Sequence, residues 1–394
     1  MQAADPGERR PRREPPVSLL TITREWGRIG CVGFGGPPAH IAMLRALCVD
    51  RRGWIRAQDF EDGIAATNLL PGPASTQLAI WCAWRLRGAR GALVGGACFI
   101  VPGLIVILAL SAVFLAARPP LWIAGAAAGA GAAVPGVALN AAIGLAPASW
   151  RRAGAARSVR ARWVCYLLAG GLAAAVIGPF LVLVLAACGL LEMLTRNPPR
   201  LRPGPRGWLL PMLAGPAAAS GGLLSLAWVA FKVGALSYGG GFVIIPLMQH
   251  DAVHTYHWTT SSQFLSAVAL GQVTPGPVVQ TVAVVGYAAA GVGGGLLASL
   301  VAFAPSFAFV LIGGPRFDRL RGNASVASFL TGAGPAAIGA IAGAAIPLAL
   351  ALSHPWQAGV LALVAVWLVG LRRGVVTAIA GAGALGVIAV LAGA

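Results

Sequence analysis

Residues 68–77 read NLLPGPASTQ, and residues 272–281 read QVTPGPVVQT. The second stretch lies 204 positions after the first, and each contains Pro-Gly-Pro at the same place. At the same offset, Phe34-Gly35-Gly36 aligns with Tyr238-Gly239-Gly240, and no gap is needed between the two matches. A tryptophan and a phenylalanine also recur between them, so the sequence predicts two related halves.

The composition indicates a membrane protein. Of 394 residues, 58% are hydrophobic and only 10% are charged, against about 25% charged in a typical soluble domain. Uncharged apolar runs long enough to cross a bilayer recur along the chain. The clearest are Gly91–Ala117, Leu121–Trp150, Ala324–Ser353, Trp356–Leu371 and Gly374–Ala394. We therefore expect an all-α polytopic membrane protein with about 10 to 13 membrane segments.

The net charge of +18 does not indicate nucleic-acid binding. The arginines form short patches between apolar runs, as in cytoplasmic loops, and no separate basic domain or aromatic–basic interleaving occurs. The basic residues Arg9 to Arg13 are followed by Arg24 and Arg28 instead of an apolar run, which argues for a cytoplasmic N-terminus and against a signal peptide. Six cysteines without a CxxC pair read as buried hydrophobic residues, and we expect no metal site and no cofactor.

Equivalent loops of the two halves differ in charge. The loop with Arg51 and Arg52 is basic, whereas its counterpart from 250 to 263 has no Lys or Arg; the opposite holds for Arg372-Arg373, whose counterpart is uncharged. By the positive-inside rule this alternation predicts halves of opposite orientation, an inverted repeat. The predicted organisation is a basic cytoplasmic tail (1–17), a first repeat (18–206), a connector (207–221) and a second repeat (222–394).

Two segments in each half contain helix-breaking residues at their middle. In the first half these are Arg28–Arg45, with Gly-Phe-Gly-Gly-Pro-Pro, and Gly63–Arg85, with Pro-Gly-Pro. Irregular backbone at membrane depth is tolerated only where it is buried in protein or lines a cavity. The basic flanks favour re-entrant hairpins, and kinked full spans are the alternative.

Two cations occupy equivalent positions before the first break of each half. Lys232, the only lysine in the chain, aligns with Arg28. Cations inside a membrane are costly and point to function, so both are candidates for an anion site, helped by helix N-termini at the breaks. The structural alternative is that both side chains extend to the membrane interface.

Polar and glycine residues around the breaks complete the candidate site. His40 is either a proton relay or anion donor, or the partner in a structural hydrogen bond. The amides and hydroxyls either donate to an oxyanion or satisfy freed backbone carbonyls. Asp59, Glu61 and Asp62 read as solvated loop charges in preference to a proton carrier. The candidate substrate-binding set is Arg28, Lys232, Gly35, Gly36, His40, Asn68, Gly72, Thr76, Gln77, Gly239, Gly240, Gln272, Thr274 and Gly276.

These motifs resemble the chromate ion transporter family in its long, two-domain form. The stretch 34–41 (FGGPPAHI) resembles the family's FGGPxAHI signature, 68–73 its NLLPGP element, and 271–278 its GQVTPGPV element. The resemblance covers both halves from about Leu19 onward. Where the family often has Lys, this chain has Arg28, and Ala74 stands where Asn is common, which puts fine substrate preference in doubt.

The resemblance implies a multi-pass protein of the bacterial inner membrane that exports chromate, conferring chromate resistance, with the membrane potential or proton gradient as driving force. A transporter or channel for sulfate or another tetrahedral oxyanion is the alternative. An intramembrane enzyme is disfavoured because no carboxylate pair or Ser–His constellation lies in the apolar runs. The expected partners are the oxyanion and the lipid bilayer, no nucleic acid is expected, and a homodimer is left open.

Overall fold

The first half of the chain is built from helices interrupted at the predicted breaks. The structure is a computed structural model that describes residues 17–68, 70, 72–116, 119–177, 181–196, 222–237, 242–313 and 323–393. The first-half helices are α1 (Leu19–Val32), α2 (Gly36–Arg45), η1 (Ala46–Arg51), α3 (Ala57–Thr67), α4 (Ala74–Phe114), α5 (Leu121–Ala153), α6 (Arg157–Leu172), η2 (Ala173–Ile177) and α7 (Leu181–Arg196). The expected N-terminal tail, except Val17, and the connector 207–221 lie outside the described residues.

The second half repeats this order. Its helices are α8 (Leu223–Leu236), α9 (Ile244–His250), η4 (Asp251–Thr255), α10 (Ser261–Val273), η5 (Val278–Gln280), α11 (Thr281–Gly313), α13 (Ala324–Leu350), α14 (Pro355–Ala365), η7 (Val366–Gly370) and α15 (Val375–Leu391). Internal prolines recur at matching places, Pro135 and Pro147 in α5 against Pro335 and Pro347 in α13. The predicted all-α fold of related halves is confirmed, and the described residues contain no strand.

The broken segments of the first half fold back on themselves. Glu25 in α1 accepts a 2.7 Å hydrogen bond from Arg52, which follows η1. A β-carbon at Gly63 in α3 would lie 2.5 Å from the ring of Trp81 in α4. Both contacts join residues on opposite sides of a break, so each segment is a hairpin with its break at the tip. This geometry favours re-entrant hairpins over kinked full spans.

The long helices α4 and α11 each contain a second reversal. Arg87 and Gly88 leave helical geometry, with φ of −144° and 59°, and Ala290 and Gly291 do the same, with φ of −152° and 62°. A β-carbon at Gly95 would lie 2.4 Å from the β-carbon of Ala83, which a straight helix would hold about 18 Å away. Each of these helices is therefore a short arm followed by a long arm that runs back past it.

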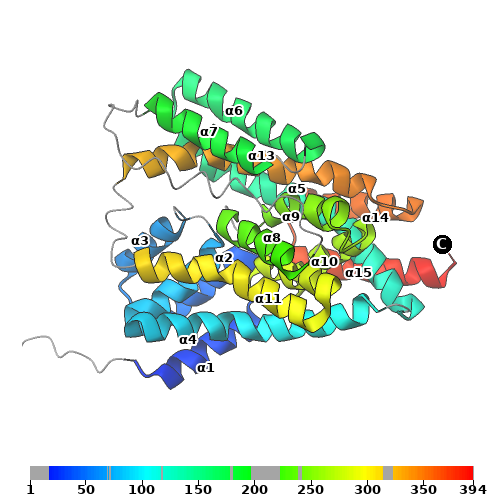
Figure 1. The fold of residues 1–394 in the computed structure, drawn as a ribbon, viewed down its shortest axis with the longest axis horizontal. Helices are drawn as coiled ribbons and strands as arrows, with labels where there is room; N and C mark the ends of the chain where they lie inside the picture. The colour runs from blue at the N-terminus through cyan, green and yellow to red at the C-terminus, as the bar shows by residue number, and fades with distance from the viewer. Residues whose placement is uncertain are drawn as a thin grey trace, which may run out of the picture.

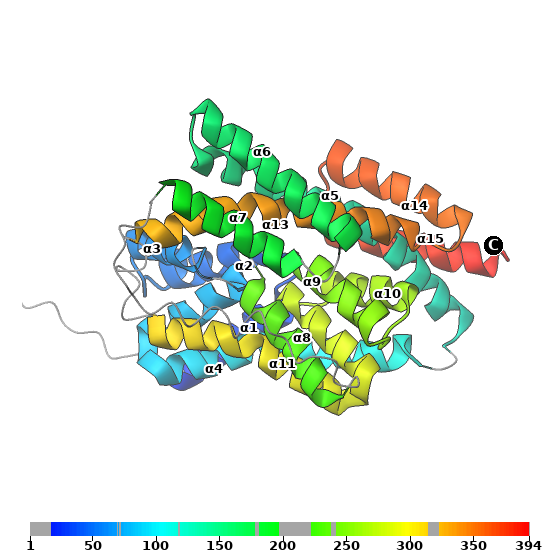
Figure 2. The same ribbon diagram turned by 45° about the horizontal axis from the view of Figure 1, so that its top comes forward.

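The two halves pack closely against one another. The long arms of α4 and α11 run side by side in opposite directions, because Gly96 of α4 faces Phe307 whereas Leu108 faces Gly295. The hairpin of α6 and α7 packs on α13, and that of α14 and α15 packs on α5, so each half covers the long helix of the other (Figures 1 and 2). Close helix contact at these crossings depends on glycine, as at Gly339, whose α-carbon faces the carbonyl of Leu167.

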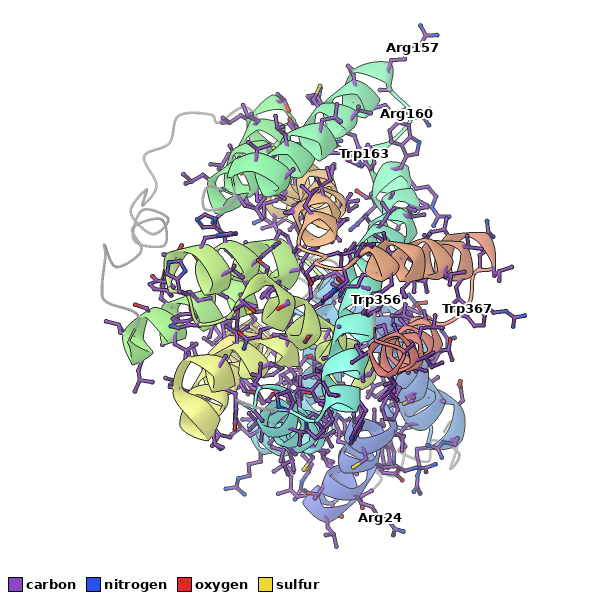
Figure 3. All side chains as sticks on the ribbon, turned by 90° about the vertical axis from the view of Figure 1, so that its right-hand side faces the viewer. Arg24, Arg157, Arg160, Trp163, Trp356 and Trp367 are labelled. Atoms are coloured by element: carbon purple, nitrogen blue, oxygen red, sulfur yellow. The ribbon has the colours of Figure 1, made fainter. Side chains whose placement is uncertain are left out.

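The described helices fit a multi-pass membrane protein. Five are long and apolar enough to cross a bilayer: Ala74–Phe114, Leu121–Ala153, Arg157–Val176, Val278–Gly313 and Ala324–Leu350. Shorter apolar helices run over Leu223–Leu236, Pro355–Gly370 and Val375–Leu391. At the start of α6, Figure 3 shows Arg157 projecting away from the protein, whereas the guanidinium of Arg160 lies 5.1 Å from the centre of the Trp150 ring. The predicted polytopic class is confirmed, and the total number of segments stays a prediction.

Candidate functional site

A cavity of about 980 Å³ lies between the two halves. The hairpin tips of the first half contribute Gly35, Asn68 and Gly72 to its wall. The second half contributes Phe242, which precedes α9, and Ile338 on α13. Non-helical backbone therefore faces a cavity here, as it must at membrane depth.

The polar groups of the cavity suit an anion. Its walls carry Arg151, Arg152, Asn68, Asn140 and Thr67, and no Asp or Glu is among the described lining residues. The two arginines occupy the last turn of α5, where the negative end of the helix dipole favours cations. Within the described part of the chain, Arg151 makes no ion pair. An anion entering this space meets the charge of Arg151, for which the described residues provide no ion-pair partner.

The start of α4 adds backbone donors at the inner end of the cavity. Gly72, with φ of 118°, turns the chain so that α4 begins at Ala74, and both residues line the cavity. The first intrahelical bond of α4 comes from Gln77 to Pro73, so the amides of residues 74–76 have no partner within the helix. The start of α2 differs because Pro37 and Pro38 have no N–H to offer.

The break of the first half is joined to the Pro-Gly-Pro of the second. The Gly33 carbonyl accepts a 3.0 Å hydrogen bond from the Gly276 amide. It also lies 2.9 Å from Nε2 of His40, which is fully buried with its ring against Phe99. His40 Nδ1 lies 3.4 Å from Ser75 Oγ. Of the two roles expected for His40, these contacts favour a structural hydrogen bond over a proton relay or anion donor.

The reciprocal contact brings Gly72 against the second half. A β-carbon at Gly72 would lie 3.4 Å from the carbonyl oxygen of Gly234 and 3.4 Å from Ser306 Oγ. Ser306 is fully buried, and its hydroxyl has no hydrogen-bond partner among the described residues. The two Pro-Gly-Pro tips are therefore held by the opposite half, and a movement between the halves displaces both tips.

The predicted amides and hydroxyls are buried in different ways. Thr76 and Gln77 are fully buried beside the start of α4, and the Thr76 hydroxyl has no partner within the described structure. Thr274 donates to the Leu270 carbonyl at 2.9 Å, satisfying its own helix. The amide nitrogen of Gln272 is buried without a partner among the described groups. Gly36 and Gly276 lie at the joined tips, whereas Gly239 and Gly240 lie outside the described residues.

The two predicted cations do not line the cavity. Arg28 is exposed on α1, and Lys232 on α8 forms an ion pair with Asp251. Of the predicted set, the cavity wall contains Gly35, Asn68 and Gly72. A role for Arg28 and Lys232 in binding stays a prediction that the cavity does not support.

Sequence reasoning missed Asn140, Arg151 and Arg152. Asn140 stands alone among apolar residues of α5, and a lone polar residue in a predicted span was the available signal. The arginines were interpreted only as a cytoplasmic loop. The first-half acids are paired at the surface, Glu61 with Arg45, and Asp59 with Arg56 at 2.9 Å and Arg85 at 3.4 Å.

The cavity opens on one side of the repeat only. Asn140, Gly144 and Ala148 are accessible along α5, but their counterparts 200 positions later on α13, Ala340, Ala344 and Leu348, are fully buried. The equivalents of the two arginines are Ala351 and Leu352. The accessible polar wall that α5 gives the cavity is therefore not repeated on α13.

Comparisons with known proteins identify the relatives of this chain. The chain matches the chromate transporter family over residues 20–193 and again over 224–387, one match in each half. It is 33% identical over 345 residues to a chromate transport protein of Cupriavidus metallidurans, covering 85% of this chain and 84% of that protein.

Two further relatives agree. A chromate transport protein of Pseudomonas aeruginosa is 31% identical over 85% of this chain and 82% of its own length. A probable chromate transport protein of Synechococcus elongatus is 29% identical over 90% of this chain and 92% of its own length. No solved structure matches the chain. With this family match in both halves, the chain belongs to the chromate transporter family.

Proposed function

We propose that this protein is a secondary active transporter that exports chromate across the bacterial inner membrane and so confers chromate resistance. The observation that carries the proposal is the cavity between the halves, with two arginines, two asparagines and no described acidic residue in its wall. A dianion needs concentrated positive charge and hydrogen-bond donors when it leaves water. The relatives named for chromate transport supply the substrate, and they give no support to sulfate.

The proposed path starts at the cytoplasmic face. Arg151 and Arg152 belong to a basic cluster that the positive-inside rule assigns to the cytoplasm. Chromate would meet these arginines first and then Asn140, Asn68 and the free amides at the start of α4. The antiparallel course of α4 and α11 supports an inverted repeat, in which rocking of the halves opens the site alternately to each side.

The test is uptake of labelled chromate into everted inner-membrane vesicles, whose exposed face is the cytoplasmic one. We expect energised uptake above that of vesicles lacking the protein. Arg151→Gln should raise the KM about 10- to 100-fold, since a hydrogen bond to a charged group is worth about 1.5–3 kcal/mol. Arg157→Gln is the matched control, because this arginine projects away from the protein (Figure 3).

Other outcomes would contradict parts of the proposal. If Arg151→Gln and Arg157→Gln have equal KM values, the cavity is not the chromate path. If sulfate at the same concentration as chromate abolishes chromate uptake, the site does not select chromate. Flux that never exceeds the equilibrium distribution in energised vesicles would indicate a channel.

A further inference from the structure

The second half contains a charged pair that the chromate path does not use. Lys232 on α8 donates to the carboxylate of Asp251 at the start of η4, and their side chains are only 15% and 12% exposed. Asp251 and Lys232 are the only charged residues of the described second half besides Arg372 and Arg373. An ion pair buried to this degree costs desolvation free energy that apolar residues would not. Such a pair suggests a role beyond stability.

Histidines surround this pair. Three of the five histidines of the chain, His250, His254 and His257, lie within eight residues around Asp251. His250 adjoins Asp251, and its ring centroid lies 5.6 Å from that of His254, which is exposed. Histidine exchanges protons near neutral pH, so this arrangement leads from solvent to the carboxylate of Asp251.

The elements packed against this cluster contribute few other charges. Helices α13 and α10 contain no titratable residue. Helix α7 contains Glu192 and Arg196, which pair with one another at 2.5 Å, and Cys188. The titratable neighbours of Asp251 on its own hairpin are therefore Lys232, His250 and His254.

Helix α9 connects this cluster to the cavity. Phe242 and Val243, directly before α9, line the cavity, and Asp251 directly follows its last residue, His250. A change at the Lys232–Asp251 pair therefore moves the wall of the cavity through one short helix. The pair also joins α8 to η4, which directly follows α9.

We propose that Asp251 is the binding site of the coupling proton, reached through His254 and His250 from the side opposite Arg151. This inference rests on the proposed function and specifies its driving ion. In the structure, the ion pair between Lys232 and Asp251 holds η4 against α8. A proton that binds the carboxylate neutralises Asp251, the ion pair separates while Lys232 keeps its charge, and α9 is released. Proton entry and chromate exit then alternate at the two ends of α9.

The first experiment reads the proton site without chromate. Dicyclohexylcarbodiimide reacts with protonated carboxyls in apolar surroundings, and mass spectrometry of the purified full-length protein locates the adduct. We expect labelling of Asp251 that rises as the pH of the reaction is lowered, because only the protonated carboxyl reacts. Asp59 is the control, because the hydrogen bond from Arg56 lowers the pKa of this carboxyl and favours its ionised form. Absence of labelling at Asp251 at every pH would overturn the proposal.

The second experiment measures coupling in everted vesicles. Asp251→Asn mimics the protonated state, so we expect at least a tenfold loss of accumulation driven by a pH gradient, while chromate–chromate exchange continues. Asp59→Asn should leave both unchanged. The double variant with Lys232→Gln removes both buried charges and keeps the test informative if Asp251→Asn alone fails to fold.

The outcomes separate the two proposals. Gradient-driven accumulation retained by Asp251→Asn would refute the proton site and leave chromate export intact. Wild-type vesicles without chromate uptake would refute the proposed function, and carbodiimide labelling would still decide whether Asp251 binds a proton.

Discussion

The two halves share one fold but divide the charges between them. In the first half, the Arg52 guanidinium lies 5.5 Å above the Trp54 ring; in the second, the Tyr256 ring lies 4.6 Å from that of Trp258. These residues are equivalent in the repeat, so the stacking is kept while the cation is replaced by an aromatic ring. If the halves are inverted as proposed, the positive-inside rule disfavours an arginine at this second-half position.

The difference extends to the long helices. The first-half helix α5 presents Asn140 and two terminal arginines to the cavity, whereas α13 lines it only with the apolar residues Ala337, Ile338 and Ile341. The two halves therefore have different roles in the proposed mechanism. The first holds the anion path, and the second holds the Lys232–Asp251 pair.

The largest expected contrast lies at the equivalent cations Lys232 and Arg28. Lys232→Ala leaves the Asp251 carboxylate buried and unpaired, and we expect it to lower the free energy of unfolding by about 3–5 kcal/mol. Arg28→Ala removes an exposed side chain and should change it by less than about 0.5 kcal/mol. Thermal unfolding in detergent measures both.

A double variant controls this contrast. Lys232→Ala combined with Asp251→Ala removes both charges and should recover most of the lost stability. Equal effects of Lys232→Ala and Arg28→Ala would mean that the pair is solvated and the two halves are equivalent at this position.

A smaller contrast is expected at the equivalent glycines Gly234 and Gly30. A β-carbon at Gly234 would lie 1.9 Å from the Ala302 carbonyl oxygen, and one at Gly30 would lie 2.8 Å from that of Cys98. Overpacking costs about 1–3 kcal/mol, so we expect about 3 kcal/mol for Gly234→Ala and about 1 kcal/mol for Gly30→Ala. Thermal unfolding tests which of the two variants loses more stability. A larger loss of stability for Gly30→Ala would mean that the helix crossing at Gly30 is the tighter one.

Much of the fold followed from the sequence because its signals are local. Apolar runs predicted the long helices, and Gly and Pro predicted the breaks at residues 33–35 and 72–73. The repeat was visible because the equivalent turns need the same residues. The reversal at Gly88 falls between the predicted broken segment, which ends at Arg85, and the predicted apolar run, which begins at Gly91.

The site was harder to predict because it depends on contacts between the halves. The contact of each Pro-Gly-Pro tip with the opposite half depends on tertiary packing, and so does the ion pair between Lys232 and Asp251. No local sequence pattern encodes such contacts. Arg151 and Arg152 were interpreted as loop charges because the sequence does not show that the end of α5 faces the cavity.

The smallest expected contrast concerns the equivalent residues Thr76 and Gln280. Gln280 donates a 2.6 Å hydrogen bond to the Ile100 carbonyl, so Gln280→Met should cost about 1–2 kcal/mol. The Thr76 hydroxyl is buried without a partner among the described residues, so Thr76→Val should leave stability unchanged or raise it by up to about 1 kcal/mol.

If the hydroxyl donates to chromate, Thr76→Val must weaken transport while the protein stays as stable as wild type. Thermal unfolding and vesicle uptake of the same preparation test this, and unchanged uptake would remove Thr76 from the site. This variant therefore distinguishes a partner that binds and leaves from imperfect packing around the hydroxyl.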